Sequence, residues 1–172
     1  MGAKFTFQGV QEYVNMLERL EKDTDVVAGK ALYEGANVVT NAIREAIKQL
    51  PTHTNRTAVD AHDQSVPLAG ITKSQKKGLL KGLGISRHEN AFNKYNVKVG
   101  FNGYNKVVTK QFPKGQPNVL VARGVESGSS MTIKTPFIRP AVNRVKREAE
   151  LAMKEAAEEE FERLMNENKE SE

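Results

Sequence analysis

Residues 112–144 read FPKGQPNVLVARGVESGSSMTIKTPFIRPAVNR, and this stretch decides how the chain folds. Four prolines and three glycines punctuate it, and residues of these two types begin or end elements rather than lie inside them. The chain therefore turns sharply here, between two helical patterns. The stretch contains no nucleophile paired with a base, no set of metal ligands and no phosphate-binding loop. We expect it to shape a surface rather than to hold an active site.

Helical signals lie within this stretch and continue beyond it. Pro117 suits the first position of a helix over residues 118–127, which Gly128 ends. A strand is expected over 131–135. Pro136 or Pro140 then opens a long helix over about 138–165, because apolar residues recur there every three or four positions. That apolar stripe comprises Ile138, Val142, Val145, Ala149, Ala152 and Ala156.

Upstream, a strand is expected over 95–101, where apolar and polar residues alternate. Asn102-Gly103 is a strong hairpin signal, so residues 104–111 are expected to return as the partner strand, either at a sheet edge or with a bulge. Thr72 caps a short helix over 73–83. Gly78 and Gly82 weaken that helix, which therefore needs support from the rest of the fold.

The remaining signals complete an α+β fold. Strands near 4–7, 95–101, 104–111 and 131–135 are expected to form a small antiparallel sheet. It packs against long helices over about 10–22, 24–50 and 138–165, with a helix cap at Asp23 or Thr24 between the first two. One domain spans 1–157, with a long loop at 51–71 that is either disordered or an ordered contact arm. Residues 158–172 form an acidic end.

Composition excludes several functional classes. The chain has 172 residues, 38% of them hydrophobic, and no cysteine, which excludes disulfides, thiol catalysis and thiolate metal sites. No apolar run approaches the ~18 residues that indicate a membrane span. The opening residues do not resemble a signal peptide. We expect a soluble intracellular protein that does not contact membranes.

Charge is divided along the chain. Residues 1–69 carry 7 basic and 9 acidic side chains, residues 70–145 carry 14 basic and 2 acidic, and residues 146–172 carry 5 basic and 10 acidic. A basic middle attracts nucleic acid. A basic middle and an acidic end also attract each other between neighbouring copies in an assembly. The charge pattern leaves both interpretations open.

No cofactor, metal ion or catalytic residue is expected. His53, Asp60, His62 and Asp63 lie in the long loop, but their spacing matches no zinc pattern. The pair His88-Glu89 lacks the second histidine of a metalloprotease helix. No serine, threonine or carboxylate is paired with a base in a recognisable motif.

Two groups of residues are candidate binding surfaces. The first is basic, facing DNA or a protein partner: Lys73, Lys76, Lys77, Lys81, Lys106 and Lys110. Aromatic residues alternate with lysines from Phe92 to Lys110, as on surfaces that bind single strands, although the same aromatics also suit a core. The second group is a candidate subunit interface: Arg123, Glu126, Phe137 and Arg139. Phe137 alternatively belongs to the core, and Arg123 with Glu126 alternatively forms a pair within one helix.

Two blocks of sequence carry a family resemblance. They are GITKSQKKGLLKGLGIS at 70–86, and PKGQPNVLVARGVESG at 113–128 followed by TPFIRPAV at 135–142. With the hairpin VKVGFNGY and the opening KFTFQGVQEYVNMLERLEK, they resemble the small neck or tail-completion proteins of long-tailed bacteriophages and prophages. The resemblance spans roughly residues 4–157. The acidic end after Glu158 departs from it, because it is longer and more charged than a packed helix requires.

The resemblance implies a virion structural protein without catalytic residues. Members of this family assemble as rings, usually six-fold, at the junction between head and tail. The implied partners are further copies of the chain, the head-closure protein and the tail-tube or tail-terminator proteins, with non-specific contact to DNA in transit. The implied location is the neck of the virion, assembled in the host cytoplasm. The alternative is a small basic nucleic-acid-binding protein.

Overall fold

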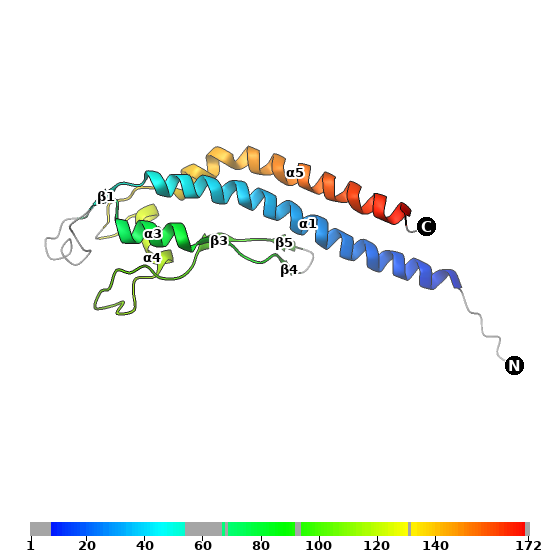
Figure 1. Ribbon diagram of the computed structural model, residues 1–172, viewed down its shortest axis with the longest axis horizontal. Helices are drawn as coiled ribbons and strands as arrows, with labels where there is room; N and C mark the ends of the chain where they lie inside the picture. The colour runs from blue at the N-terminus through cyan, green and yellow to red at the C-terminus, as the bar shows by residue number, and fades with distance from the viewer. Residues whose placement is uncertain (1–7, 54–66, 68, 92–93, 131, 171–172) are drawn as a thin grey trace.

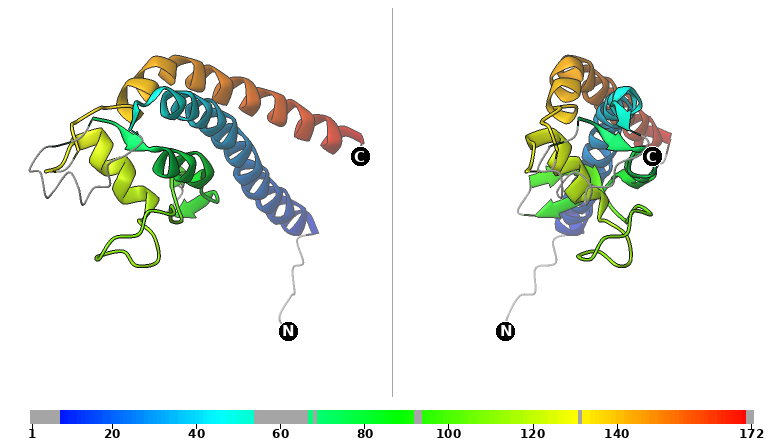
Figure 2. Two further views of the ribbon diagram at one scale, coloured as in Figure 1. Left: turned by 60° about the vertical axis from the view of Figure 1, so that its left-hand side comes forward. Right: turned by 90° about the vertical axis from the view of Figure 1, so that its left-hand side faces the viewer.

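The computed structural model describes residues 8–53, 67, 69–91, 94–130 and 132–170. Two long helices, α1 (Gln8–Gln49) and α5 (Ile138–Glu170), run antiparallel and side by side along the molecule (Figure 1). The other face of α1 is covered by a lobe of short strands with α3 (Lys73–Gly82) and α4 (Asn118–Ser127), as two further views show (Figure 2). α1 is thus the middle layer. The mixture of helices and strands confirms the α+β class.

The strands are short and form three separate pairs. β1 (Thr52–His53) pairs in parallel with β2 (Ile71–Thr72). β3 (Leu83–Ile85) pairs antiparallel with β6 (Val99–Phe101), in a register that places Gly84 opposite Gly100. β4 (Glu89–Ala91) pairs antiparallel with β5 (Lys94–Asn96).

The predicted sheet differs from these pairs. The expected strand at 95–101 is divided between β5 and β6, and β6 pairs with the upstream β3 instead of a downstream partner. The return strand expected over 104–111 is wrong, because this segment closes on itself through an isolated bridge between Tyr104 and Pro117. Of the described residues 132–135, none belongs to a strand; Ser129 and Thr132 instead exchange backbone hydrogen bonds across a tight turn. The expected strand at 4–7 lies outside the described residues.

The helices agree more closely with the sequence. α4 occupies the predicted residues 118–127, and Thr72 caps α3 in a reciprocal capping box with Gln75. The break expected at Asp23 or Thr24 is wrong, since α1 runs through both residues. Neither Pro nor Gly stands at that point, and Asp or Thr within a helix costs only up to about 0.7 kcal/mol relative to Ala.

The core lies where the C-terminal half of α1 meets the lobe and the start of α5. Its most deeply buried large side chains come one each from α1, β2, α3 and α4: Ile47, Ile71, Leu79 and Val125. Phe137 closes the core beside α5, and its ring lies 6.3 Å from that of Phe101 in β6. The core therefore joins all the major elements at one end of the helix pair.

Two glycines explain how α3 is supported. Gly78 and Gly82 are one turn apart, and a Cβ atom at Gly82 would lie 2.3 Å from the backbone oxygen of Asn102. A Cβ atom at Gly78 would lie 2.6 Å from the Cβ atom of Asn105. The missing side chains let the chain around residues 102–105 lie directly against the helix, which supplies the predicted tertiary support.

The substitution Gly82→Ala tests this close approach. The added methyl group would meet a backbone atom that cannot swing aside, so we expect a loss of about 1–3 kcal/mol in the free energy of unfolding, measured with urea. Gly124→Ala in α4 is the matched control, because its Cβ would meet nothing within 4 Å. The control should gain up to about 1 kcal/mol from helix propensity. Equal behaviour of the two variants would contradict the packing role of Gly82.

Candidate interaction surfaces

A single carboxylate connects α4 to the start of α5. Glu126, near the end of α4, accepts hydrogen bonds from the backbone N–H groups of Phe137 (2.8 Å), Ile138 (2.8 Å) and Arg139 (3.0 Å). Ile138 and Arg139 open α5 and Phe137 directly precedes it, and N–H groups at this end of a helix have no partner within the helix. A negative charge is also favourable at this end of a helix. We call this connection, Glu126 with residues 137–139, the joint.

The joint shifts the ionisation of Glu126. Partial burial on its own would raise the pKa of the Glu126 carboxyl group. The three backbone N–H donors and the nearby charge of Arg139 outweigh burial and hold this pKa below its usual value. The carboxyl group is therefore charged at neutral pH, as the cap requires.

The structure divides the four candidate interface residues. Phe137 is buried, with 4% of its surface exposed, which favours the alternative that it belongs to the core. The carboxylate of Glu126 is used within the chain by the joint. Arg123 and Arg139 are exposed. These two arginines are the members of the group that another molecule can reach.

The lysines of α3 fall into two groups. Lys73, Lys77 and Lys81 are exposed and lie at intervals of four residues, which places them along one side of the helix. Lys76 points instead to the end of α1, where its Nζ donates to the carbonyl oxygens of Lys48 and of Leu50, the latter at 2.9 Å. A cation at this position satisfies carbonyl groups that the helix leaves free.

The segment 104–117 is a loop that is closed at its base. The buried Asn105 donates from both its backbone N–H and its side chain to the carbonyl oxygen of Gln116. The buried Asn118 donates from its backbone to Gly103 and from its side chain to Asn102. Compact surface loops with adjacent ends are frequently functional.

The loop carries both apolar and basic side chains on its exterior. Tyr104 and Val108 are 68% and 64% exposed, the two highest values among the exposed large hydrophobic residues of the described chain. Lys106, Lys110 and Lys114 are exposed as well. We call these five residues the loop surface.

The described aromatic residues of this region do not form one stacking platform. Tyr95 stacks on His88 with ring centroids 5.6 Å apart, and Phe101 packs against Phe137. Tyr104 is exposed, and Phe92 lies outside the described residues. The described aromatic side chains are therefore not gathered on one surface, as binding of a single strand requires.

Two hollows lie on the described part of the chain, and each is lined by a single ionisable side chain. The larger, of about 320 Å³, lies between the end of α1 and the start of α5, and Arg144 is its one ionisable lining residue. The smaller, of about 130 Å³, has His53 as its one ionisable lining residue. The described residues contain no group of three or more His, Cys, Asp or Glu suited to a metal ion. Asp60, His62 and Asp63 lie outside the described residues.

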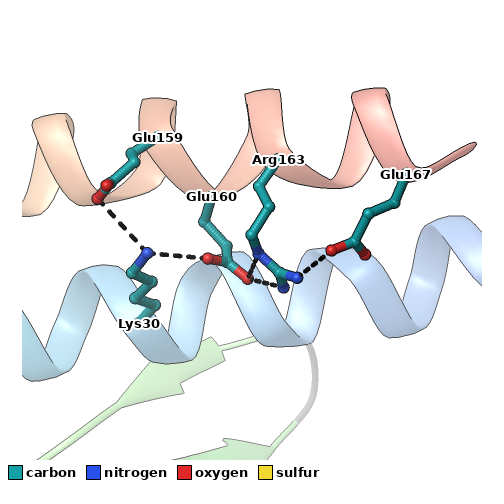
Figure 3. A network of polar contacts seen from close by, with 5 residues as sticks. All are labelled: Lys30, Glu159, Glu160, Arg163 and Glu167. Atoms are coloured by element: carbon teal, nitrogen blue, oxygen red, sulfur yellow. Dashed lines mark hydrogen bonds and ion pairs between the residues drawn. The ribbon is translucent and has the colours of Figure 1, made fainter. Parts of the chain in front are cut away.

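The middle of α1 and the C-terminal part of α5 are joined by a network of charges (Figure 3). The Nζ of Lys30 on α1 lies 2.9 Å from Glu160 and 3.4 Å from Glu159 on α5. Glu160 also accepts from Arg163, which in turn pairs with Glu167. Glu160 is only 4% exposed, while Glu159 is largely exposed.

The network lowers the pKa of Glu160 to about 2. The hydrogen bonds from Arg163 contribute most and those from Lys30 come next, and together they exceed the opposing effect of burial. The same contacts raise the pKa values of Arg163 and Lys30. The sequence did not single out this network, although the spacing of Glu160, Arg163 and Glu167 along one helix indicates pairing.

Comparisons with protein-family models, with curated proteins and with solved structures found no match. In the part of the chain that the structure describes, no helix has both the length and the apolar character needed to cross a membrane.

Glu126→Gln tests the joint. The amide keeps the size of the side chain but loses its charge, so we expect a loss of about 1–2 kcal/mol in the free energy of unfolding at pH 7. Because the folded pKa is lowered, the wild-type advantage exists above the unfolded pKa and disappears as pH falls through the folded value. Glu148→Gln, at an exposed position on α5, is the control and should change little. Unchanged stability of Glu126→Gln at pH 7 would show that the cap does not hold α5.

Glu160→Gln tests the network, with its neighbour Glu159→Gln as control. The first variant leaves Lys30 and Arg163 without a buried counter-charge, and we expect a lower melting temperature at pH 7. The difference from wild type should shrink as pH falls from the ordinary value of 4.5 towards 2. Glu159→Gln should melt close to wild type, because exposed pairs contribute little. Equal melting of both variants would contradict the role given to Glu160.

Proposed function

We propose that this chain is a virion structural protein, a ring-forming subunit of the phage neck that completes the tail and joins it to the head-closure complex. The observation that carries the proposal is the joint. It sets the direction of the long helix pair relative to the lobe through three hydrogen bonds to one carboxylate. A ring subunit needs its contact surfaces at a defined angle, because a small change of angle alters closure.

The resemblance of residues 70–86 and 113–142 to tail-completion proteins points to the same function. The joint lies within that second block. In this proposal the partners are further copies of the chain, usually six to a ring, and the head-closure and tail-terminator proteins. The subunit works by assembly in the host cytoplasm and resides in the neck of the virion, without catalysis.

Electron microscopy of particles made without this protein tests the proposal. We expect heads and tails that fail to join, and recovery of joined particles when the wild-type chain is supplied from a plasmid. A chain with Gly124→Ala, whose added Cβ meets nothing within 4 Å, should restore joining equally well. Normal joined tails in particles that lack the protein would overturn the proposed function.

The exposed stripe of Lys73, Lys77 and Lys81 favours the second candidate, a small basic nucleic-acid-binding protein. A titration with duplex DNA at two salt concentrations separates the candidates. Contact with DNA in transit should be weak and should fade at physiological salt, because it releases counterions from few phosphates. Tight binding to one sequence that survives physiological salt would favour the second candidate.

A further inference from the structure

Two surfaces at opposite ends of the molecule combine exposed apolar side chains with an excess of charge of one sign. The loop surface lies below α4 at one end, and the C-terminal half of α5 lies at the other (Figure 1). Scattered apolar residues are ordinary on a protein surface, but apolar residues gathered with a charged rim indicate an interaction site.

The exposed large apolar residues of α5 lie on the face that points away from α1. Leu151, Phe161 and Met165 are 51%, 57% and 44% exposed. At 3.6 residues per turn they fall within about 80° of one another and on the opposite side from Ala149 and Ala156, which are buried. Phe161 and Met165 therefore do not continue the apolar stripe that ends at Ala156.

Acidic side chains accompany this outer face. Glu155, Glu158 and Glu162 are exposed on the same stretch of helix, where the exposed Lys154 lies 3.6 Å from Glu158 and offsets one of the three negative charges. We call these three residues, with Leu151, Phe161 and Met165, the arm face. The loop surface has the opposite character, since its Tyr104 and Val108 are accompanied by lysines alone. Between residues 90 and 125 the sequence contains no acidic residue at all.

We propose that the loop surface of one copy docks on the arm face of the next copy, and that this contact builds the ring. The inference rests on the proposed function and names the surfaces that perform it. Apolar side chains meet apolar side chains, and lysines meet glutamates at the rim, where complementary charge directs encounter and excludes other orientations.

The charges favour this head-to-tail contact over a symmetric one. Two loop surfaces together would place lysines against lysines, and two arm faces would place glutamates against glutamates. A contact between two different surfaces of the same chain leaves one of each free at the ends of any short assembly. Such an assembly grows until it closes. Nucleic acid is the less favoured partner for the loop surface, because it accounts for neither exposed Val108 nor the arm face, and because arginine, the better ligand for phosphate and bases, is absent from it.

The test uses two variants of the full chain, each with one surface disrupted. The loop variant carries Val108→Asp and Lys110→Glu, and the arm variant carries Leu151→Asp and Phe161→Asp, so that the two altered surfaces are both acidic and do not pair with each other. All four positions are exposed, so folding should persist, which circular dichroism and thermal melting check. A control variant changes a matched pair outside both surfaces, Ile133→Asp and Lys134→Glu.

Sedimentation velocity then measures the size of each species at a concentration where the wild-type chain self-associates. We expect each surface variant alone to associate at least about thirtyfold more weakly, and the control to behave as wild type. An equimolar mixture of the loop and arm variants should form a one-to-one dimer and nothing larger. The dimer uses the intact arm face of the first variant and the intact loop surface of the second.

Any of three other results overturns the inference. These are assembly of either variant like wild type, absence of the mixed dimer, and a wild-type chain that stays monomeric at several hundred micromolar. Loss of DNA binding by the loop variant with unchanged self-association would assign the loop surface to nucleic acid. If wild type and both variants all form rings, the surfaces are wrong while the neck function stands. The particles made without the protein test that function separately.

Discussion

The carboxylate of Glu126 is the constraint on which the rest of the architecture depends. A helix of 33 residues starts at Ile138, and the backbone N–H groups at its start need hydrogen-bond acceptors. The acceptor is the carboxylate of Glu126 on α4 rather than a side chain of the residues just before α5. The direction of α5 is therefore tied to α4. Since α4 packs on α3 and the core joins both to α1, the same carboxylate relates the long helix pair to the lobe.

Similar bonds hold the other element ends. Lys76 on α3 donates to a carbonyl group at the end of α1. Asn105 and Asn118, which lie against α3, hold the base of the loop closed. In each case one polar side chain satisfies backbone groups from a distant part of the sequence. The apolar core supplies the general attraction, and these bonds at the ends select one relative placement of the elements.

Local signals in the sequence predicted local structure well. Thr72 and the residues after Pro117 fix where α3 and α4 start, because caps and proline act within one turn. The pairing of strands was not predictable in this way. Asn102-Gly103 does turn the chain, but the partner of β6 is the upstream β3, and no property of residues 104–111 alone reveals that choice. The four candidate interface residues were chosen by residue type, but the long-range cap formed by Glu126 depends on the fold, which residue spacing does not encode. The outer face of α5 was recoverable in principle, by plotting Leu151, Phe161 and Met165 on a helix.

The closed base of the loop has an evolutionary consequence. Residues 106–114 are separated from the core by the bonds at Asn105, Gln116 and Asn118, so their identity and number are free to change while the fold is kept. Under the docking proposed above, related chains can therefore change the partner that they bind faster than they change their fold. Two chains with matching helices and different loop tips would then sort into separate assemblies within one cell.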